Sequence, residues 1–377
     1  MPITKTDKKK DGLQGYRVRV NYTDKDGRYA RVERIAYGLS EAKELEQKIL
    51  SDIAKPKKKI TVEKIFEEYK DYKKSNVRLS SYNKSISILE LRVIPYFKNI
   101  SIDKLTKHIL VDWKKKISES NLSIVTKQNT YREFTALLNY AVSVDYIPNN
   151  PLLAIGNFKD RYLEAEQQIR KVRYYTKEDF KKFITAARDY AKERDSLNAW
   201  GYYVFFNIAF FCGMRKGEIN ALKWSDINGD IISITRSVTQ KLKGVSVFEG
   251  PPKNKSSIRE IQIPVPLYEI LKEHKVRQQK IKGFSEENRV CGGSDVLKDT
   301  SLENANILFA KTAGLSKIRI HDFRHSHASL LCNEGINIQE IARRLGHSNV
   351  QTTWNTYSHL YPRENERAIS ILNTIQI

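Results

Sequence analysis

The chain has 377 residues, enough for two or three domains, and 40% of them are hydrophobic, which excludes a wholly disordered protein. Its 66 lysines and arginines against 44 acidic residues give a net charge of +22. This balance predicts a polyanionic partner, with nucleic acid as the obvious one, because cationic side chains neutralise its phosphate backbone. Three cysteines, odd in number and far apart, favour neither a disulfide framework nor a zinc site and are typical of a reducing compartment. The longest apolar run, 202–214, is shorter than the roughly 20 residues that span a bilayer. We therefore expect a cytoplasmic protein without a membrane role.

The first module, residues 1–54, is predicted to combine strands with one helix. Residues 16–20 alternate between apolar and polar side chains, as a half-buried strand does, and residues 28–37 alternate again after a turn. Ser40 is the predicted N-cap of the helix that follows. A basic linker at 55–59 ends the module.

The second region, residues 60–148, is predicted to be helical and to be followed by a charged linker up to about Lys171. Lys127 and Arg132 lie off its apolar stripe, where they are candidates for contacts with a DNA backbone, although ordinary solvated charges explain them equally well. The stripe recurs at helical spacing and consists of Phe134, Leu137, Leu138, Ala141 and Val142.

The third region, residues 172–377, is predicted to mix helices with a small antiparallel sheet. Thr176 is the expected N-cap of its first helix, and the apolar residues 202–212 indicate a buried second helix. The sheet is expected from β-branched alternation at 231–234, 245–248 and 258–263. The fold class is therefore predicted as multidomain, mainly α with small β-sheets.

Six residues of the third region supply what metal-independent phosphodiester cleavage requires: a nucleophile, cationic donors for the non-bridging oxygens and an acid for the leaving oxygen. Arginine forks bind phosphate bidentately, and histidines near neutral pKa exchange protons. A phenol, with a pKa of about 10, needs a cationic field and a base before it can attack. Each residue alone has an ordinary structural explanation, so the prediction depends on the ordered set. The set is Arg215, Lys253, His321, Arg324, His347 and Tyr357.

Two other interpretations stay open at this stage. His321, His325 and His327 are close enough in sequence to suggest a metal site, but no carboxylate pattern accompanies them, so we predict no metal and assign packing or hydrogen bonding to the last two. Residues 338–347 have the spacing of a helix-turn-helix, which would make the chain a non-enzymatic DNA-binding regulator. That alternative leaves Arg215 and the segment around Arg324 unexplained.

Five segments resemble the tyrosine recombinases, in particular the integrases of phages and of conjugative transposons of Gram-positive bacteria. The resemblance covers the whole chain at the level of domains and is most specific over 205–360. The segments are 212–227 (CGMRKGEINALKWSDI), 252–259 (PKNKSSIR), 321–329 (HDFRHSHAS), 345–353 (LGHSNVQTT) and 355–359 (NTYSH).

The resemblance implies a mechanism in which Tyr357 attacks the scissile phosphate and forms a 3′-phosphotyrosyl bond, so that neither ATP nor a metal cofactor is needed. Lys255 stays open as a second choice for the general acid. Supercoil relaxation by a type IB topoisomerase uses similar chemistry and is the enzymatic alternative. The resemblance assigns the phosphate clamp to Arg215 and Arg324, the general acid to Lys253, the base to His321, a second phosphate donor to His347 and a brace on the first arginine to Glu218.

The resemblance also implies domains and partners. Residues 1–54 would bind arm-type DNA sites as a three-stranded sheet with a helix, with Arg17 and Arg19 as candidate DNA contacts. Residues 60–148 would be the core-binding domain, and 172–377 the catalytic domain. The apolar tail at 362–377 would dock on a neighbouring protomer, giving a dimer on one site and a tetramer in the synaptic complex. An accessory excision factor is a further expected partner, and the protein would join the bacterial nucleoid when on DNA. Phage and transposon origins both stay open.

Overall fold

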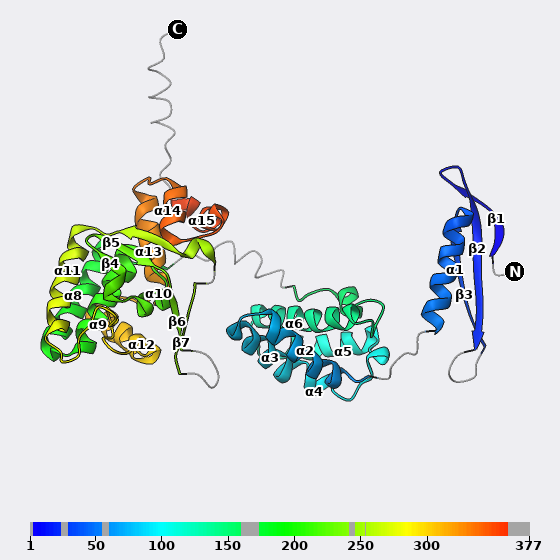
Figure 1. Cartoon of the computed structure of the whole chain (residues 1–377), viewed down its shortest axis with the longest axis horizontal. Coiled ribbons are helices and arrows are strands. Elements are labelled where there is room, and N and C mark those ends of the chain that lie inside the picture. Colours follow the sequence, from blue (N-terminus) through cyan, green and yellow to red (C-terminus); the bar gives the residue numbers. More distant parts are fainter. Residues whose placement is uncertain are drawn as a thin grey trace, which may run out of the picture. The chain divides into compact units, whose positions relative to one another are not determined.

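The computed structural model describes residues 3–23, 29–54, 60–159, 173–240, 246–252 and 254–360. Lys253 and the predicted tail, 362–377, lie outside the described residues. The chain divides into two compact units, Met1–Asp160 and Arg161–Ile377 (Figure 1). The predicted fold class is confirmed, because the described elements are mostly helices with small antiparallel sheets.

An antiparallel sheet with one helix on it forms the start of the first unit. The strands β1 (Ile3–Lys10), β2 (Leu13–Thr23) and β3 (Tyr29–Tyr37) follow one another in the sheet, and α1 (Leu39–Ala54) packs against them. Their common core consists of Val18, Val20, Ala36, Ala42 and Ile49.

Two details of this module differ from the sequence-based expectation. The first strand was not predicted from its own pattern, because residues 3–10 are mostly lysine, threonine and aspartate and show no apolar alternation. The helix begins at Leu39, so Ser40 lies inside it and is not its N-cap. The Glu41 carboxylate instead accepts a hydrogen bond from the backbone N–H of Tyr37 at 2.9 Å, which serves the turn before the helix.

A helical bundle forms the rest of the first unit. The predicted apolar stripe is confirmed: four of its members are fully buried, and Val142 packs partly against them. The N-caps Thr61, Thr106 and Ser123 each accept a hydrogen bond from a backbone N–H of the first turn. The helices are α2 (Val62–Asn76), α3 (Leu79–Arg92), α4 (Ile94–Phe97), α5 (Lys107–Glu119) and α6 (Ile124–Ser143).

The bundle continues beyond residue 148, where its end was expected. A 3₁₀ turn, η2 (Pro151–Ile155), brings Leu152 into the bundle core, and Phe158 is buried there as well. The Tyr131 hydroxyl donates to the Leu152 carbonyl at 3.0 Å. Lys114 donates to three successive carbonyls from Ile155 onward. The predicted linker therefore begins too early, because its first apolar residues complete the core.

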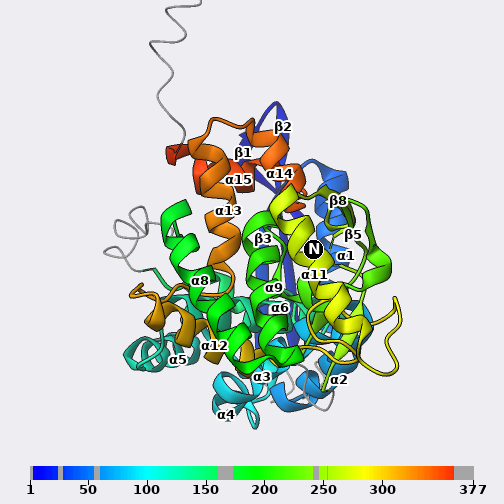
Figure 2. The same cartoon turned by 90° about the vertical axis from the view of Figure 1, so that its left-hand side faces the viewer.

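The second unit is built around the helix α9 (Leu197–Cys212), which confirms the predicted buried helix. Val204, Phe205 and Phe206 of α9 are fully buried. The helices α8 (Lys177–Arg194), α11 (Val265–Gln279) and α13 (Asp322–Asn333) pack against α9 (Figure 2). Thr176 caps α8 as predicted, in a reciprocal pair of 3.1 Å hydrogen bonds with Asp179. The remaining helices are α10 (Lys216–Ala221), α12 (Asp299–Thr312), α14 (Ile338–Leu345) and α15 (Val350–Tyr357).

The predicted β region forms two small antiparallel sheets instead of one. The first has the order β4 (Ile227–Asn228), β5 (Ile231–Ile234), β8 (Arg259–Gln262). The second pairs β6 (Ser237–Thr239) with β7 (Phe248–Gly250). In the first sheet Ile232 and Ile261 are register partners and both are buried, which anchors the sheet in the core. Short 3₁₀ turns, η1 (Ile102–Lys104), η3 (Trp224–Asp226), η4 (Lys255–Ser257) and η5 (Ser358–Leu360), complete the elements.

No helix in the described ranges has both the length and the apolar composition that crossing a membrane requires.

Candidate active site

Sharp turns at helix ends position two of the predicted site residues of the second unit. Gly213 ends α9 with φ +61°, and a side chain there would meet His327 at 2.6 Å. Gly346 ends α14 with φ +68°, next to the Arg259 guanidinium. Glycine adopts this left-handed geometry without strain, so both turns can be tight. Arg215 follows the first turn and His347 follows the second.

Two arginines, the buried Arg324 and the half-buried Arg215, donate hydrogen bonds to backbone carbonyls of these turns. The Arg324 side chain is 3% exposed and donates to the carbonyls of Gly213 at 2.8 Å and Leu345 at 2.6 Å. Arg215 donates to the carbonyl of Gly346 at 3.4 Å. Burial, followed by the nearby charge of Arg215, lowers the pKa of Arg324 to about 9. The guanidinium is still charged at neutral pH, in a setting that favours an incoming anion.

A buried carboxylate fixes the first arginine. Glu218 of α10 is 2% exposed and accepts from the Arg215 backbone N–H at 3.0 Å and from its guanidinium at 2.7 Å. Arg259 of β8 donates to the same carboxylate at 3.1 Å. Burial opposes ionisation of Glu218, but Arg259 and Arg215 outweigh it and lower the pKa of its carboxyl. Glu218 therefore lies where the sequence expected a brace on Arg215.

Arg259 is a member of this cluster that sequence reasoning missed. Its side chain is 6% exposed and also donates to the carbonyls of Arg344 at 2.6 Å and Ser257 at 3.0 Å. It thus links β8 to α14 and to Glu218. Arg215 and Arg259 both pair with the Glu218 carboxylate, and the charge of Arg324 acts on the same cluster, so three positive charges stand against one negative charge. One signal in the sequence could have pointed to Arg259. It lies at the start of a predicted strand, and a buried arginine is unusual there.

His347 is oriented by a buried hydroxyl. Its Nδ1 lies 2.8 Å from Oγ1 of Thr353, which is fully buried in α15. Burial, followed by the charges of Arg324 and Arg215, lowers the pKa of His347 to about 4. The ring is therefore neutral at physiological pH, and with Nδ1 occupied, Nε2 is the ring atom left to meet a ligand.

Tyr357 is the last residue of α15 and is almost completely buried, with 2% exposure. Its phenol oxygen lies 2.5 Å from Nδ1 of His325, one residue after Arg324 on α13. Burial raises the pKa of the phenol, and Arg324 offsets only part of that effect. Burial, followed by the neighbouring His321, lowers the pKa of His325 to about 4. The pair is thus a neutral phenol bonded to a neutral imidazole.

His321, the expected base, is placed differently. It is exposed at the start of α13, and its ring meets that of His325 edge-on, with centroids 5.2 Å apart. Among the described residues, no hydrogen bond joins His321 to Tyr357. The expectation that His325 and His327 make hydrogen bonds holds, since His327 bonds the carbonyl of Phe210 at 2.8 Å. The sequence did not indicate that the partner of His325 is the predicted nucleophile.

The four candidate DNA contacts of the first unit have partners within the chain. Arg17 and Arg19 both pair with Glu33, at 3.2 and 3.0 Å, on partly exposed strands. Lys127 donates to the carbonyl of Ser118, and Arg132 to the side chain of Asn129. Their contact with DNA stays a prediction.

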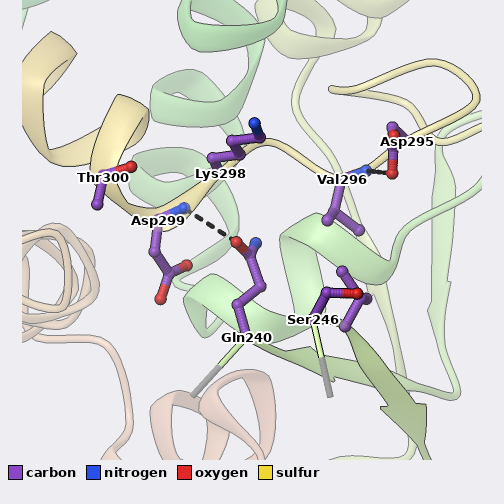
Figure 3. A pocket seen from close by; sticks show the side chains of 8 residues that line it. Gln240, Ser246, Asp295, Val296, Lys298, Asp299 and Thr300 are labelled. Atoms are coloured by element: carbon purple, nitrogen blue, oxygen red, sulfur yellow. Dashed lines mark hydrogen bonds between the residues drawn. The ribbon is translucent and has the colours of Figure 1, made fainter. Parts of the chain in front are cut away.

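A pocket of about 560 Å³ opens elsewhere on the second unit, lined by residues such as Gln240, Ser246, Lys298 and Asp299 (Figure 3). None of the predicted site residues lines it. In the parts of the chain that the structure describes, no group of three or more histidine, cysteine, aspartate or glutamate side chains could hold a metal ion.

Residues 173–364 match the model of the phage integrase family, and residues 61–118 match the SAM-like N-terminal domain of phage integrases. The chain belongs to the phage integrase family. This integrase is 27% identical over 361 residues to the ICEBs1 integrase of Bacillus subtilis (strain 168), covering 93% of this chain and 94% of that one. It is 26% identical over 345 residues to a XerC-like tyrosine recombinase of Caldanaerobacter subterraneus, with 83% and 78% covered.

Solved structures share the fold of the integrase. The Tn1549 transposon integrase bound to transposon right end DNA superposes with a TM-score of 0.62 at 20% identity, covering 84% of this chain and 100% of that one. A lambda integrase dimer bound to a core site superposes with a TM-score of 0.57 at 16% identity, covering 97% and 95%. The prediction of a tyrosine recombinase is confirmed, and the topoisomerase and regulator alternatives are not favoured. The segment 338–347 forms α14 and the turn to His347.

Proposed function

We propose that this integrase cuts and rejoins DNA through a covalent bond between Tyr357 and a 3′ phosphate, and thereby integrates and excises a mobile element. The observation that carries this proposal is the placement of Tyr357. A buried phenol at the end of α15 is hydrogen-bonded to His325, whose neighbour Arg324 belongs to the cationic cluster. A tyrosine in ordinary core packing needs no such cluster next to it.

Each step of cleavage has a residue to perform it. The phenol oxygen of Tyr357 loses its proton to a neighbouring histidine and attacks phosphorus, and the bond from phosphorus to the 5′ oxygen breaks. Arg215, Arg324 and Nε2 of His347 stabilise the charge on the non-bridging oxygens. Lys253 protonates the 5′ oxygen, with Lys255 as the other choice. The phosphotyrosine keeps the energy of the broken bond, so the 5′ hydroxyl of a partner strand can attack it without ATP.

The proposal includes double-stranded DNA as substrate and a homo-oligomer as the active species. It is supported by the family, and by structures of lambda integrase as a dimer bound to a core site and as a tetramer bound to a Holliday junction. We assign arm-site binding to residues 1–54, core-site binding to the bundle at 60–158, catalysis to 172–377 and protomer coupling to the tail at 362–377. The protein would act in the bacterial cytoplasm, on nucleoid DNA, with an accessory excision factor for the reverse reaction.

The test is covalent trapping on a nicked suicide substrate. Tyr357→Phe should bind DNA normally and form no covalent complex, whereas Tyr361→Phe, the nearest other phenol in the sequence, should trap DNA as the parent protein does. Arg215→Lys keeps the charge but loses the fork, so cleavage should fall by ~10²-fold or more with little change in binding. EDTA should not alter the rate. Covalent product from Tyr357→Phe at undiminished yield would refute the proposal.

A further inference from the structure

The phenol of Tyr357 and the ring of His325 form a contact that the established family assignment does not explain. His325 Nδ1 and the phenol oxygen are 2.5 Å apart, and the ring centroids are 5.7 Å apart. Residues 325 and 357 come from different helices, α13 and α15, which pack against each other. The contact therefore depends on the tertiary fold and involves the atom that has to react.

The geometry separates two histidines that the sequence leaves equivalent. His321 and His325 are four residues apart on one helical face, so their rings touch. The ring centroid of His325 is 5.2 Å from that of His321 and 5.7 Å from that of Tyr357, and its Nδ1 bonds the phenol oxygen. His321 is exposed, whereas His325 is partly buried next to a buried hydroxyl. Direct proton exchange with the phenol is open to His325.

We propose, building on the tyrosine nucleophile proposed above, that His325 rather than His321 accepts the phenol proton of Tyr357 during cleavage and returns it during rejoining. In cleavage the phenol O–H bond breaks, the oxygen bonds to phosphorus, and the proton moves to Nδ1. In rejoining the 5′ hydroxyl gives its proton to the lysine that protonated it in cleavage, and its oxygen bonds to phosphorus. The bond from phosphorus to the tyrosine oxygen breaks, and the imidazolium returns its proton to that oxygen. Atoms and charge balance over the two steps, and no further reactant is needed.

The electrostatics of the contact keep the phenol of Tyr357 protonated in the structure. Burial raises the pKa of the phenol, and the pKa of His325 is lowered to about 4, so the proton stays on the tyrosine. A neutral ring leaves the lone pair of Nδ1 free to accept the phenol hydrogen. The phenol oxygen becomes acidic only as it bonds to phosphorus, and the proton then passes to the base already in contact with it.

The experiment compares His325→Asn with His321→Asn in the full-length protein under single-turnover conditions on a suicide substrate. Asparagine places an oxygen near the position of Nδ1, so it keeps a hydrogen-bond acceptor but cannot take up a proton. We expect His325→Asn to slow cleavage by about 10²-fold or more at unchanged DNA affinity. Replacing Tyr357 by 3,5-difluorotyrosine, a more acidic phenol, should restore most of that loss and should do less for His321→Asn.

A second substrate distinguishes the loss of the general base from the loss of the general acid. With sulfur in place of the bridging 5′ oxygen, the leaving group needs no proton, so Lys253→Ala should recover its rate and His325→Asn should not. Three results would overturn the inference: a parental rate for His325→Asn, no restoration by difluorotyrosine, or restoration confined to His321→Asn. Tyr357→Phe is run alongside. If that variant still traps DNA, the proposed nucleophile itself is wrong, whatever His325 does.

Discussion

Replacing Glu218 by glutamine tests whether the carboxylate holds the cationic cluster together. Glu218 accepts three hydrogen bonds, two from Arg215 and one from Arg259, at 2.7 to 3.1 Å. Glutamine has the same shape, but it carries no charge and turns one acceptor oxygen into an N–H donor facing a guanidinium. Arg259, with a side chain 6% exposed, would lose its buried counter-charge.

The expected cost is large because both groups are buried. Removing one partner of a buried ion pair costs about 3–5 kcal/mol, and 1 kcal/mol shifts the melting temperature of a domain of this size by about 2–4 °C. We expect the second unit to melt roughly 6–20 °C lower. The pKa of Glu218 is lowered in the folded state, so its stabilisation is present at neutral pH and is lost as the pH falls below the unfolded value of about 4.3. In Glu218→Gln this contribution to the loss of stability at acidic pH should be absent.

The assay is thermal unfolding followed by circular dichroism, together with DNA binding and cleavage. Glu340→Gln is the matched control, because Glu340 pairs with Arg343 on the exposed face of α14, where the pair should contribute less than about 1 kcal/mol. DNA affinity should not fall in Glu218→Gln, since the charge removed is negative, whereas cleavage should fall by ~10²-fold as Arg215 loses its orientation. A melting temperature equal to that of Glu340→Gln would refute the reasoning.

Four further outcomes are expected. Thr353→Val should leave the fold and DNA affinity intact and slow cleavage by about tenfold, the scale of one hydrogen bond of roughly 0.5–1.5 kcal/mol, because His347 loses its orienting hydroxyl; an unchanged single-turnover rate would contradict this. Burial lowers the pKa of His274 to about 4, so below about pH 6.5 the unfolded state binds more protons at this residue than the folded state does, and His274 should supply about 2 kcal/mol of the stability lost between pH 7 and pH 5, in addition to what His325 and His347 supply; urea unfolding of His274→Gln should show a loss smaller by that amount, and an equal loss in both proteins would count against it. Phe134→Ala should destabilise the bundle by about 3–5 kcal/mol in denaturant melts. Deleting residues 1–54 should abolish binding to arm-type repeats in gel-shift assays and leave core-site cleavage measurable.

Local patterns carried much of the prediction. The apolar stripe that ends at Val142 could be predicted because helical periodicity repeats every three to four residues and does not depend on distant parts of the chain. The N-cap at Thr176 could be predicted for a similar reason, since its hydrogen-bond partner, Asp179, is only three residues away in the sequence. The first strand, β1, was not predicted from its sequence because a lysine-rich segment has no strand pattern of its own. Its pairing with β2 decides its structure.

By itself, the sequence determined the kind of chemistry, because an ordered set of arginines, histidines and a tyrosine is a property of the chain. Only the tertiary structure decided which of these groups touch. Glu218 meets Arg259 across 41 positions, and His325 meets Tyr357 across 32. Such contacts depend on how helices pack and where tight turns end them, and no spacing along the chain encodes the distance between two side chains. The burial that keeps the phenol protonated arises in the same way, from residues of α13 and α14 that pack around it.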